Sequence, residues 1–322
     1  MVCVIGEALI DLVLDPGSDR DPGSDHRESS DGSDRYTAHP GGSPYNVAIG
    51  LARLGQPSTL LARLSDDAFG RQLRRHAVHN GVDLSAAVAA PEPTTLAVVG
   101  LDEQRNAVYD FYLNGTADWQ WTAAELDRMP ADTSWIHTGS LASWTAPGAP
   151  VIEAHLTRRR AGSAVVVSYD PNIRPRLMPE RDVAVVQIER MIALADVVKA
   201  SAEDLEWLYP GVEIAQVLAT WRKLGPALVV VTEGSDGAHA MTDDDELFTV
   251  PARRVAVVDT VGAGDAFMAG LINALARSGL AHKVKSADSM RPIVAEAILV
   301  AALTCARAGA NPPTASELAA AR

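Results

Sequence analysis

Near the C-terminal end of the chain, an apolar run leads through a glycine turn into a segment with a helical pattern. Residues 255–258 form the apolar run, and the turn holds Gly262, Ala263 and Gly264 before Asp265. The first N–H groups of a helix have no partner within it and carry the positive end of its dipole, so they attract anions. Glycines also let the backbone approach a phosphate closely. We therefore predict an apolar strand over 255–258 and an anion-binding turn at 262–264.

Asp265 brings a negative charge into this turn, where it repels the anion that the turn attracts. Phosphoryl transfer to a hydroxyl would give this carboxylate a role. It would accept the proton of the attacking alcohol while the N–H groups stabilise charge on the transferred phosphoryl group. The alternative is structural, because acidic residues favour the first turn of a helix. The turn alone leaves these two interpretations about evenly balanced.

Three other kinds of site fail on the sequence. A dinucleotide-binding fingerprint needs a small residue three positions after the second glycine, where this chain has Phe267. No G-x-x-x-x-G-K-[ST] stretch occurs, which excludes a P-loop. The eight histidines are scattered, and no pair has the spacing of catalytic zinc ligands.

Two further glycine turns could bind ligands. The stretch 229–237 leaves an apolar run through glycines, and loops at the carboxyl ends of parallel strands are where open α/β sheets bind ligands. The stretch 41–46 places two glycines before a helical pattern with Asn46 in its first turn. An amide can donate to and accept from a sugar hydroxyl. Taken alone, a simple β-turn and a plain helix start explain these stretches better.

Apolar runs and helical patterns alternate along most of the chain, which implies a mostly parallel sheet covered on both faces by helices. Runs at 8–14, 94–101 and 106–113 do not belong in such a core, and the last two read as a hairpin. We expect these three runs to form a small β layer beside the core, as a lid. The other predicted strands are 2–5, 58–64, 133–137, 164–169, 197–199, 227–231 and 238–241, and the predicted helices are 44–54, 67–80, 149–160, 181–195, 202–209, 263–277 and 288–308.

The composition is that of a globular enzyme. The chain has 322 residues, of which 47% are hydrophobic and 21% charged, and a formal net charge of −13. This size suits one large α/β domain or two smaller ones, and the composition excludes collagen, coiled coil and wholesale disorder. An acidic chain without a basic block is a poor candidate for binding nucleic acid or an anionic membrane. The stretch 15–35, rich in Asp, Ser, Gly and Pro, is interpreted as a solvated loop.

The ends of the chain favour a cytoplasmic protein. The first dozen residues carry Glu7 and Asp11 and no basic segment, unlike a signal peptide. The longest uncharged apolar stretch, 297–306, falls short of the ~20 residues of a membrane span. The two cysteines, Cys3 and Cys305, are interpreted as small buried apolar residues. Such use of cysteine fits a reducing compartment.

Four blocks of the chain, in this order, resemble the ribokinase-like carbohydrate kinases, also called the phosphofructokinase B family. They are GGSPYNVAIGLARLG at 41–55, SYDPNIRPRL at 168–177, ADVVKASAEDLEWL at 195–208 and DTVGAGDAFMAG at 259–270. The two middle blocks are most similar to the fructokinase branch. The resemblance covers essentially the whole chain. It implies one three-layer α/β/α ribokinase-like domain over 1–322, with a mostly parallel central sheet and a small β-sheet lid from about 8–40 and 94–118.

The resemblance also implies roles for individual residues. Asp265 matches the catalytic base, and Arg174 matches a residue that reaches toward the substrate or the transferring phosphate, which suits a guanidinium. The residues that match the anion hole are Gly262, Ala263 and Gly264. The residues that match sugar-binding positions are Asp11, Gly41, Gly42 and Asn46. The residues that match nucleotide-binding positions are Lys199, Ser201, Thr232, Gly234, Gly237 and Gly264.

Two metal sites are implied in the same way. Asp204 falls in the block that faces Mg²⁺, but here Asp204 stands where many relatives have Glu, and Ser201 where they have Asn. Many relatives bind a monovalent cation beside the anion hole. A side-chain oxygen often found near that site is replaced here by Pro313. The positions that match the monovalent site are Asp259 and the carbonyls of Val261, Thr304, Arg307 and Gly309.

The resemblance thus implies ATP-dependent phosphorylation of a sugar hydroxyl with Mg²⁺, and with K⁺ as a candidate activator. A ketohexose such as fructose is the favoured substrate. Kinases of 2-keto-3-deoxygluconate, the main alternative, often carry Arg where this chain has Leu113. A nucleoside kinase is more remote, as is a non-catalytic sugar- or nucleotide-binding protein, which would have lost part of the 262–265 turn. The expected partners are the sugar and ATP, with a homodimer through the β lid as a candidate assembly.

Overall fold

The computed structural model describes residues 1–14, 35–101, 107–162, 164–279 and 286–322. Its central sheet has eight strands in the spatial order β14-β13-β12-β11-β10-β9-β1-β4. The six strands from β12 to β4 in that order are parallel, whereas β13 pairs antiparallel with both β12 and β14. They are β1 (Val2–Ile5), β4 (Ser58–Leu61), β9 (Trp135–Gly139), β10 (Val166–Asp170), β11 (Val197–Ser201), β12 (Leu228–Thr232), β13 (Ala238–Met241) and β14 (Leu247–Val250).

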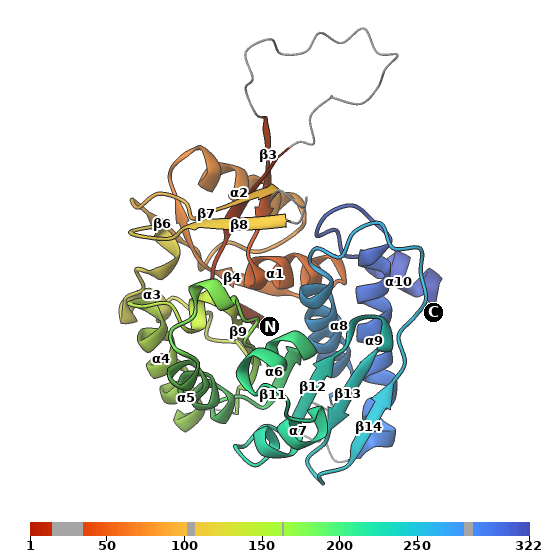
Figure 1. The fold of residues 1–322 in the computed structure, drawn as a ribbon. Helices are drawn as coiled ribbons and strands as arrows, with labels where there is room; N and C mark the ends of the chain where they lie inside the picture. The colour runs from red at the N-terminus through yellow and green to blue at the C-terminus, as the bar shows by residue number, and fades with distance from the viewer. Residues whose placement is uncertain (15–34, 102–106, 163, 280–285) are drawn as a thin grey trace, which may run out of the picture.

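Helices cover both faces of this sheet, which gives three layers (Figure 1). On one face the apolar side chains of the sheet pack in a common core with those of α1, α8 and α9, and on the other with those of α4 to α7. Alternate residues of each strand point to opposite faces of the sheet, so each helix layer packs against one set of apolar side chains. The helices are α1 (Ser43–Arg53), α2 (Ala68–His79), α3 (Ala123–Leu126), α4 (Gly148–Gly162), α5 (Arg181–Ala193), α6 (Ala202–Leu208), α7 (Ile214–Arg222), α8 (Ala263–Ser278), α9 (Ala287–Cys305) and α10 (Ala315–Ala321).

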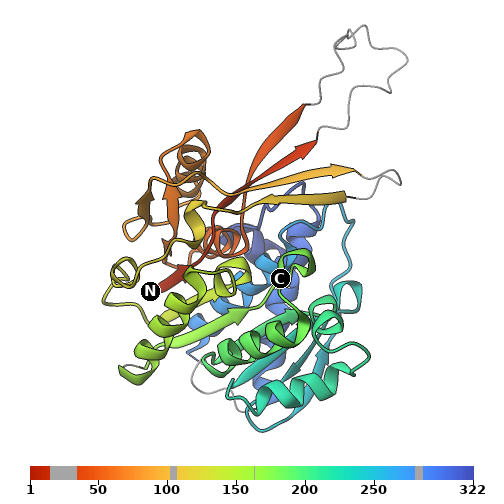
Figure 2. The same cartoon turned by 60° about the vertical axis from the view of Figure 1, so that its left-hand side comes forward.

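A separate sheet of four strands stands beside the core, in the order β3-β2-β7-β8. It consists of β2 (Leu9–Leu14), β3 (Tyr36–Gly41), β7 (Leu96–Leu101) and β8 (Ala107–Tyr112), and it projects from the core in Figure 2. The predicted hairpin is confirmed, because β7 and β8 pair antiparallel. The prediction of a small β layer outside the parallel core is confirmed as well. A further pair, β5 (Arg63–Ser65) and β6 (Val88–Ala90), lies apart from both sheets.

The predicted strand at 255–258 is wrong. These residues form no strand, and Val257 and Val258 are each 64% exposed. The run does not pair with β14, the strand at this edge of the sheet. Instead the N–H groups of Val258 and Asp259 donate to the carbonyl of Cys305, at the end of α9. The segment therefore crosses the surface and reaches the glycine turn from outside the sheet.

Other predictions fall outside the described part of the chain or were incomplete. The loop at 15–35 lies almost wholly outside the described residues, as does the turn between the hairpin strands. β3, β14, α7 and α10 were not predicted, because their sequences carry only short or mixed apolar patterns. Within the described residues, no helix has both the length and the apolar character needed to cross a bilayer.

Candidate active site

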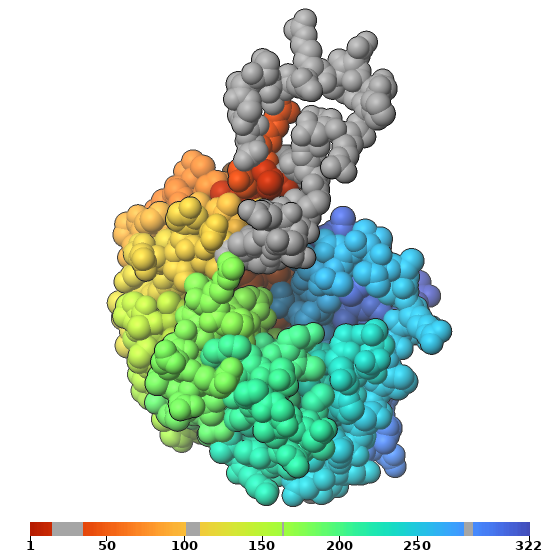
Figure 3. All heavy atoms as spheres, in the orientation of Figure 1, coloured from red at the N-terminus to blue at the C-terminus, as the bar shows by residue number. Residues whose placement is uncertain are grey.

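A cavity of about 980 Å³ lies between the small sheet and the core. Figure 3 shows the middle of the chain (green) facing its C-terminal part (blue) across a recess. The walls come from the small sheet, from the start of α1, from the loops after β9 and β10, and from the start of α8. Of the predicted site residues, those that line it are Asp11, Gly42, Asn46, Arg174, Lys199, Asp259, Val261, Gly262, Ala263, Gly264, Asp265 and Gly309.

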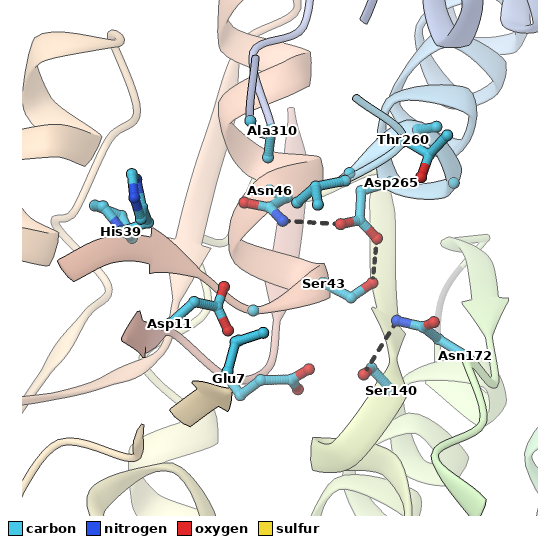
Figure 4. Close-up of a pocket in the computed structure, with 18 of the residues that line it drawn as sticks. Glu7, Asp11, His39, Ser43, Asn46, Ser140, Asn172, Thr260, Asp265 and Ala310 are labelled. Carbon is cyan, nitrogen blue, oxygen red and sulfur yellow. Dashed lines mark hydrogen bonds between the residues drawn. The ribbon is translucent and has the colours of Figure 1, made fainter. Parts of the chain in front are cut away.

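Asp265 sits in the first turn of α8 with both carboxylate oxygens engaged (Figure 4). The Ser43 hydroxyl donates to Oδ1 at 2.6 Å, and the Asn46 amide donates to Oδ2 at 2.9 Å. Burial raises the pKa of Asp265, although these two bonds and the charges of Lys199 and Arg174 act in the opposite direction. The start of α1 and the start of α8 are thus joined through this one carboxylate.

The glycine turn before Asp265 leaves room for close neighbours. Gly262 has a φ of 73°, and a Cβ there would lie 2.6 Å from the Cβ of Ala310. A Cβ on Gly264 would lie 2.9 Å from the Lys199 Nζ. The Ala263 N–H already donates to the Thr260 carbonyl at 3.2 Å, so an anion there would have to replace that bond.

Lys199 is held beside this turn by a buried ion pair. Its Nζ lies 2.9 Å from Asp170 Oδ2, and its side chain is 4% exposed. Burial by itself would lower the pKa of Lys199, but the facing carboxylates of Asp170, Asp204 and Asp265 outweigh it and raise the pKa. A permanent positive charge is therefore fixed next to Gly264.

The predicted sugar-binding residues meet at the junction of the small sheet with α1. Burial raises the pKa of Asp11 to about 6, and the nearby charge of Arg174 partly offsets this rise. Gly41 does not line the cavity, but a Cβ there would lie 2.1 Å from Asp11 Oδ2, so its lack of a side chain makes room for that carboxyl. Gly42, with a φ of 102°, lets α1 begin against the carbonyl of Glu7.

The predicted nucleotide residues Thr232, Gly234 and Gly237 lie at the end of β12 and in the turn to β13, and they do not line the cavity. Ser201 and Asp204 form a capping box at the start of α6. Asp204 accepts N–H bonds on both oxygens, from Ile173 at 2.7 Å and from Ser201 at 2.8 Å.

The positions predicted for a monovalent cation lie around the turn after α9. Asp259 accepts the Val261 N–H at 3.0 Å and the Gly309 N–H at 2.8 Å, which ties this turn to the approach to α8. Thr304 and Arg307 do not line the cavity, and the Thr304 carbonyl accepts the Arg307 N–H at 3.0 Å. Among the described residues, no group of three or more His, Cys, Asp or Glu could hold a metal ion.

Several cavity residues were not predicted. Ser43, Glu7 and Asn172 line the cavity, but none of them was given a role there. Ser43 and Asn172 fall within the blocks at 41–55 and 168–177 that carry the family resemblance, whereas Glu7 lies outside the blocks. Leu113 was expected near the substrate, but it packs against the core on the α4–α7 side and does not line the cavity. Arg176 does line it, next to Arg174. A cation for an acidic substrate could therefore come from the loop after β10 and not from β8.

A mostly parallel sheet between two helix layers, with a carboxylate beside a glycine turn in a cavity under a second small sheet, defines an enzyme of the carbohydrate-kinase class. The chain belongs to the pfkB family of carbohydrate kinases, which it matches over residues 1–317. This confirms the resemblance and the fold that it implied.

Individual relatives are fructokinases. The chain is 36% identical to "Fructokinase" of Rhizobium leguminosarum bv. trifolii over 283 residues, which cover 88% of this chain and 82% of that protein. It is 34% identical to "Fructokinase" of Klebsiella pneumoniae, covering 87% and 85%. Among solved structures, it is similar to the Xylella fastidiosa fructokinase with bound ATP, with a TM-score of 0.87, 28% identity, and coverage of 99% and 97%. It is also similar to the Vibrio cholerae O395 fructokinase with fructose, ADP and calcium, with a TM-score of 0.83, 29% identity, and coverage of 99% and 97%.

Proposed function

We propose that this chain transfers the terminal phosphoryl group of ATP to a hydroxyl of a ketohexose, with fructose as the favoured substrate. The carrying observation is the Asp265 carboxylate, held by Ser43 and Asn46 in the wall of the cavity, at a turn whose Gly264 lets the Lys199 ammonium approach closely. Relatives named as fructokinases support the choice of sugar.

In the proposed reaction, Asp265 takes the proton of the attacking hydroxyl. The freed oxygen forms a bond to the terminal phosphorus of ATP as the bond to ADP breaks. Charge that develops on the transferred group is stabilised by N–H groups of the 262–264 turn and by Arg174 and Lys199. Asp11, Gly42 and Asn46 hold the other hydroxyls, with Gly41 making room for Asp11. We place the nucleotide against Thr232, Gly234 and Gly237.

Mg²⁺ and K⁺ complete the proposal. Because Asp204 already accepts two N–H bonds, we assign Mg²⁺ to the phosphates of ATP and to water, as is usual for this ion, and not to a direct bond with Asp204. Asp259 and the carbonyls of Val261, Thr304, Arg307 and Gly309 would hold K⁺. The small sheet would act as the lid of one domain over 1–322, and a homodimer through that lid stays a prediction.

A second candidate function is a kinase of 2-keto-3-deoxygluconate. The observation that favours it is the pair Arg174 and Arg176, which both line the cavity. Guanidinium groups bind a carboxylate well through paired hydrogen bonds. Arg174 would then have to serve both the substrate carboxylate and the transferring phosphoryl group, which is why fructose is favoured.

The test is ATP consumption by the purified protein with a panel of ketoses, aldoses, keto-deoxy acids and nucleosides. The proposal expects fructose to give the highest kcat/KM of the panel. A keto-deoxy acid in first place would establish the second candidate. No ATP consumption with any member would contradict both kinases.

A further inference from the structure

Ser43 is the first residue of α1, and its hydroxyl contacts the carboxylate that the proposed reaction uses. Its side chain does not cap the helix; the capping position belongs to Gly42 and has no side-chain bond. Instead Ser43 Oγ donates to Asp265 Oδ1 at 2.6 Å (Figure 4). O–H···O⁻ bonds of this length are charge-assisted and about twice as strong as bonds between neutral groups. Ser43 is thus a strong donor to the ionised form of Asp265.

The surroundings of Asp265 oppose its ionisation, so a donor that favours the charged form is important. Burial favours the neutral acid and raises the pKa of Asp265, which works against a group that must accept a proton. Four other charged groups face Asp265. Lys199 on β11 and Arg174 in the loop after β10 favour the carboxylate, whereas Asp11 on β2 and Asp170 on β10 oppose it. The hydrogen bonds from Ser43 and Asn46 add to the two cations.

The two donors also restrict how Asp265 is oriented. A carboxylate has about four lone-pair positions, two on each oxygen. Ser43 and Asn46 occupy one position on each oxygen, from residues three apart in the first turn of the same helix. This arrangement fixes the plane of the carboxylate and leaves one lone pair on each oxygen for the proton of a substrate.

We propose that Ser43 is a positioning residue for phosphoryl transfer, whose hydroxyl holds Asp265 ionised and oriented toward the substrate hydroxyl. This inference rests on the proposed function, in which Asp265 is the base. The bond to Ser43 stabilises the charged form, so its loss raises the pKa of Asp265. The base is then protonated at a higher pH, and activity is lost earlier as the pH falls.

The test is the pH dependence of kcat/KM for the sugar that the wild type phosphorylates fastest. In Ser43→Ala, we expect the acid limb to move up by about one pH unit, which is about tenfold in kcat/KM on the acid side. At pH values above the acid limbs of both proteins, kcat/KM of the variant should approach that of the wild type. Ser43→Cys, with a weak thiol donor, should shift the limb in the same direction, and Ser43→Thr, which keeps the hydroxyl, should leave it near its wild-type position.

The matched control is Ser58→Ala. Ser58 is also buried and also packs against α1, where its hydroxyl donates to the Ala48 carbonyl at 3.4 Å, but it does not line the cavity. The Ser58→Ala variant should keep the acid limb at its wild-type pH. A second measurement, the ¹³C titration of the Asp265 carboxyl by NMR, should show the same upward shift in Ser43→Ala without depending on turnover.

The outcomes separate this inference from the proposed function. A Ser43→Ala protein that loses activity equally at every pH, or that keeps the wild-type limb, overturns the role of Ser43 even when Asp265→Asn abolishes turnover. Near-normal turnover in Asp265→Asn overturns the base itself, and with it both proposals. A shifted limb that is absent in Ser58→Ala supports Ser43.

Discussion

The two sides of the cavity are built in different ways. On the side proposed for the sugar, side-chain bonds from Ser43 and Asn46 on α1 hold Asp265 on α8. On the side proposed for the nucleotide, the loop at 232–237 does not line the cavity, and the segment 251–261 crosses the surface with exposed valines. The side proposed for the sugar is therefore pre-organised by partly buried polar side chains, whereas the side proposed for the nucleotide consists of backbone turns and exposed surface. Single side-chain changes should be felt far more on the sugar side.

The largest effect should come from Asp265→Asn. Asn is nearly isosteric but cannot accept the proton of the attacking alcohol, so kcat should fall by roughly 10²–10⁴-fold. The KM for ATP should change little, since the backbone turn remains. Steady-state kinetics with fructose measure both. A variant that keeps more than about a tenth of wild-type turnover would sink the role of Asp265 as base.

The next largest effect should come from Gly264→Val, on the boundary between the two sides. A Cβ there would lie 2.9 Å from Lys199 Nζ, so a branched side chain would displace the ammonium and obstruct a phosphoryl group. We expect a loss in kcat of roughly 10²-fold, the size seen when one electrostatic stabiliser is removed. The control is Gly162→Val at the exposed end of α4, where a Cβ meets nothing within 4 Å. Near-normal kcat in a folded Gly264→Val protein would make the turn structural.

A smaller effect concerns the choice of sugar. We expect kcat/KM for fructose to exceed that for 2-keto-3-deoxygluconate by at least ~10-fold. This ratio corresponds to about the free energy of one charge-assisted hydrogen bond. Arg176→Gln should lower activity toward the keto acid more than activity toward fructose, because only the acid needs a second cation. Measuring both sugars at the same ATP and Mg²⁺ concentrations tests this. A wild-type preference for the keto acid would overturn the choice of fructose.

The smallest effect should come from the nucleotide side. Val258 is 64% exposed, next to residues 259–261 of the cavity wall, and exposed apolar side chains beside a cavity are candidates for ligand contact. Val258→Ser should raise the KM for ATP by about threefold and leave the KM for the sugar unchanged. A threefold rise corresponds to a fraction of the free energy gained when one valine side chain is buried. Val183→Ser, 58% exposed on α5, should change neither value. An unchanged KM for ATP in Val258→Ser would place the nucleotide elsewhere.

The chain's own patterns predicted most of its elements, and the motifs together with the family resemblance named part of the cavity lining. Helix and strand periodicity is local, so the alternating units, the hairpin and α1 were predicted within a few residues. The run 255–258 misled because four apolar residues look the same whether or not a strand lies beside them. Leu113 misled for another reason: it follows the end of β8, where only the tertiary packing decides whether a side chain turns toward the cavity or toward the core.

The sequence by itself determined the chemistry that was available: an acid beside a glycine turn, two glycines before a helix with Asn46, and the family that these blocks indicate. Only the tertiary structure decided which groups meet. Ser43 and Asp265 are 222 positions apart, and Lys199 and Asp170 are 29 apart, so neither pair is visible as a spacing. The pairs exist because parallel strands and the helices between them bring their ends to the same edge of the sheet, where burial then requires each charge to find a partner.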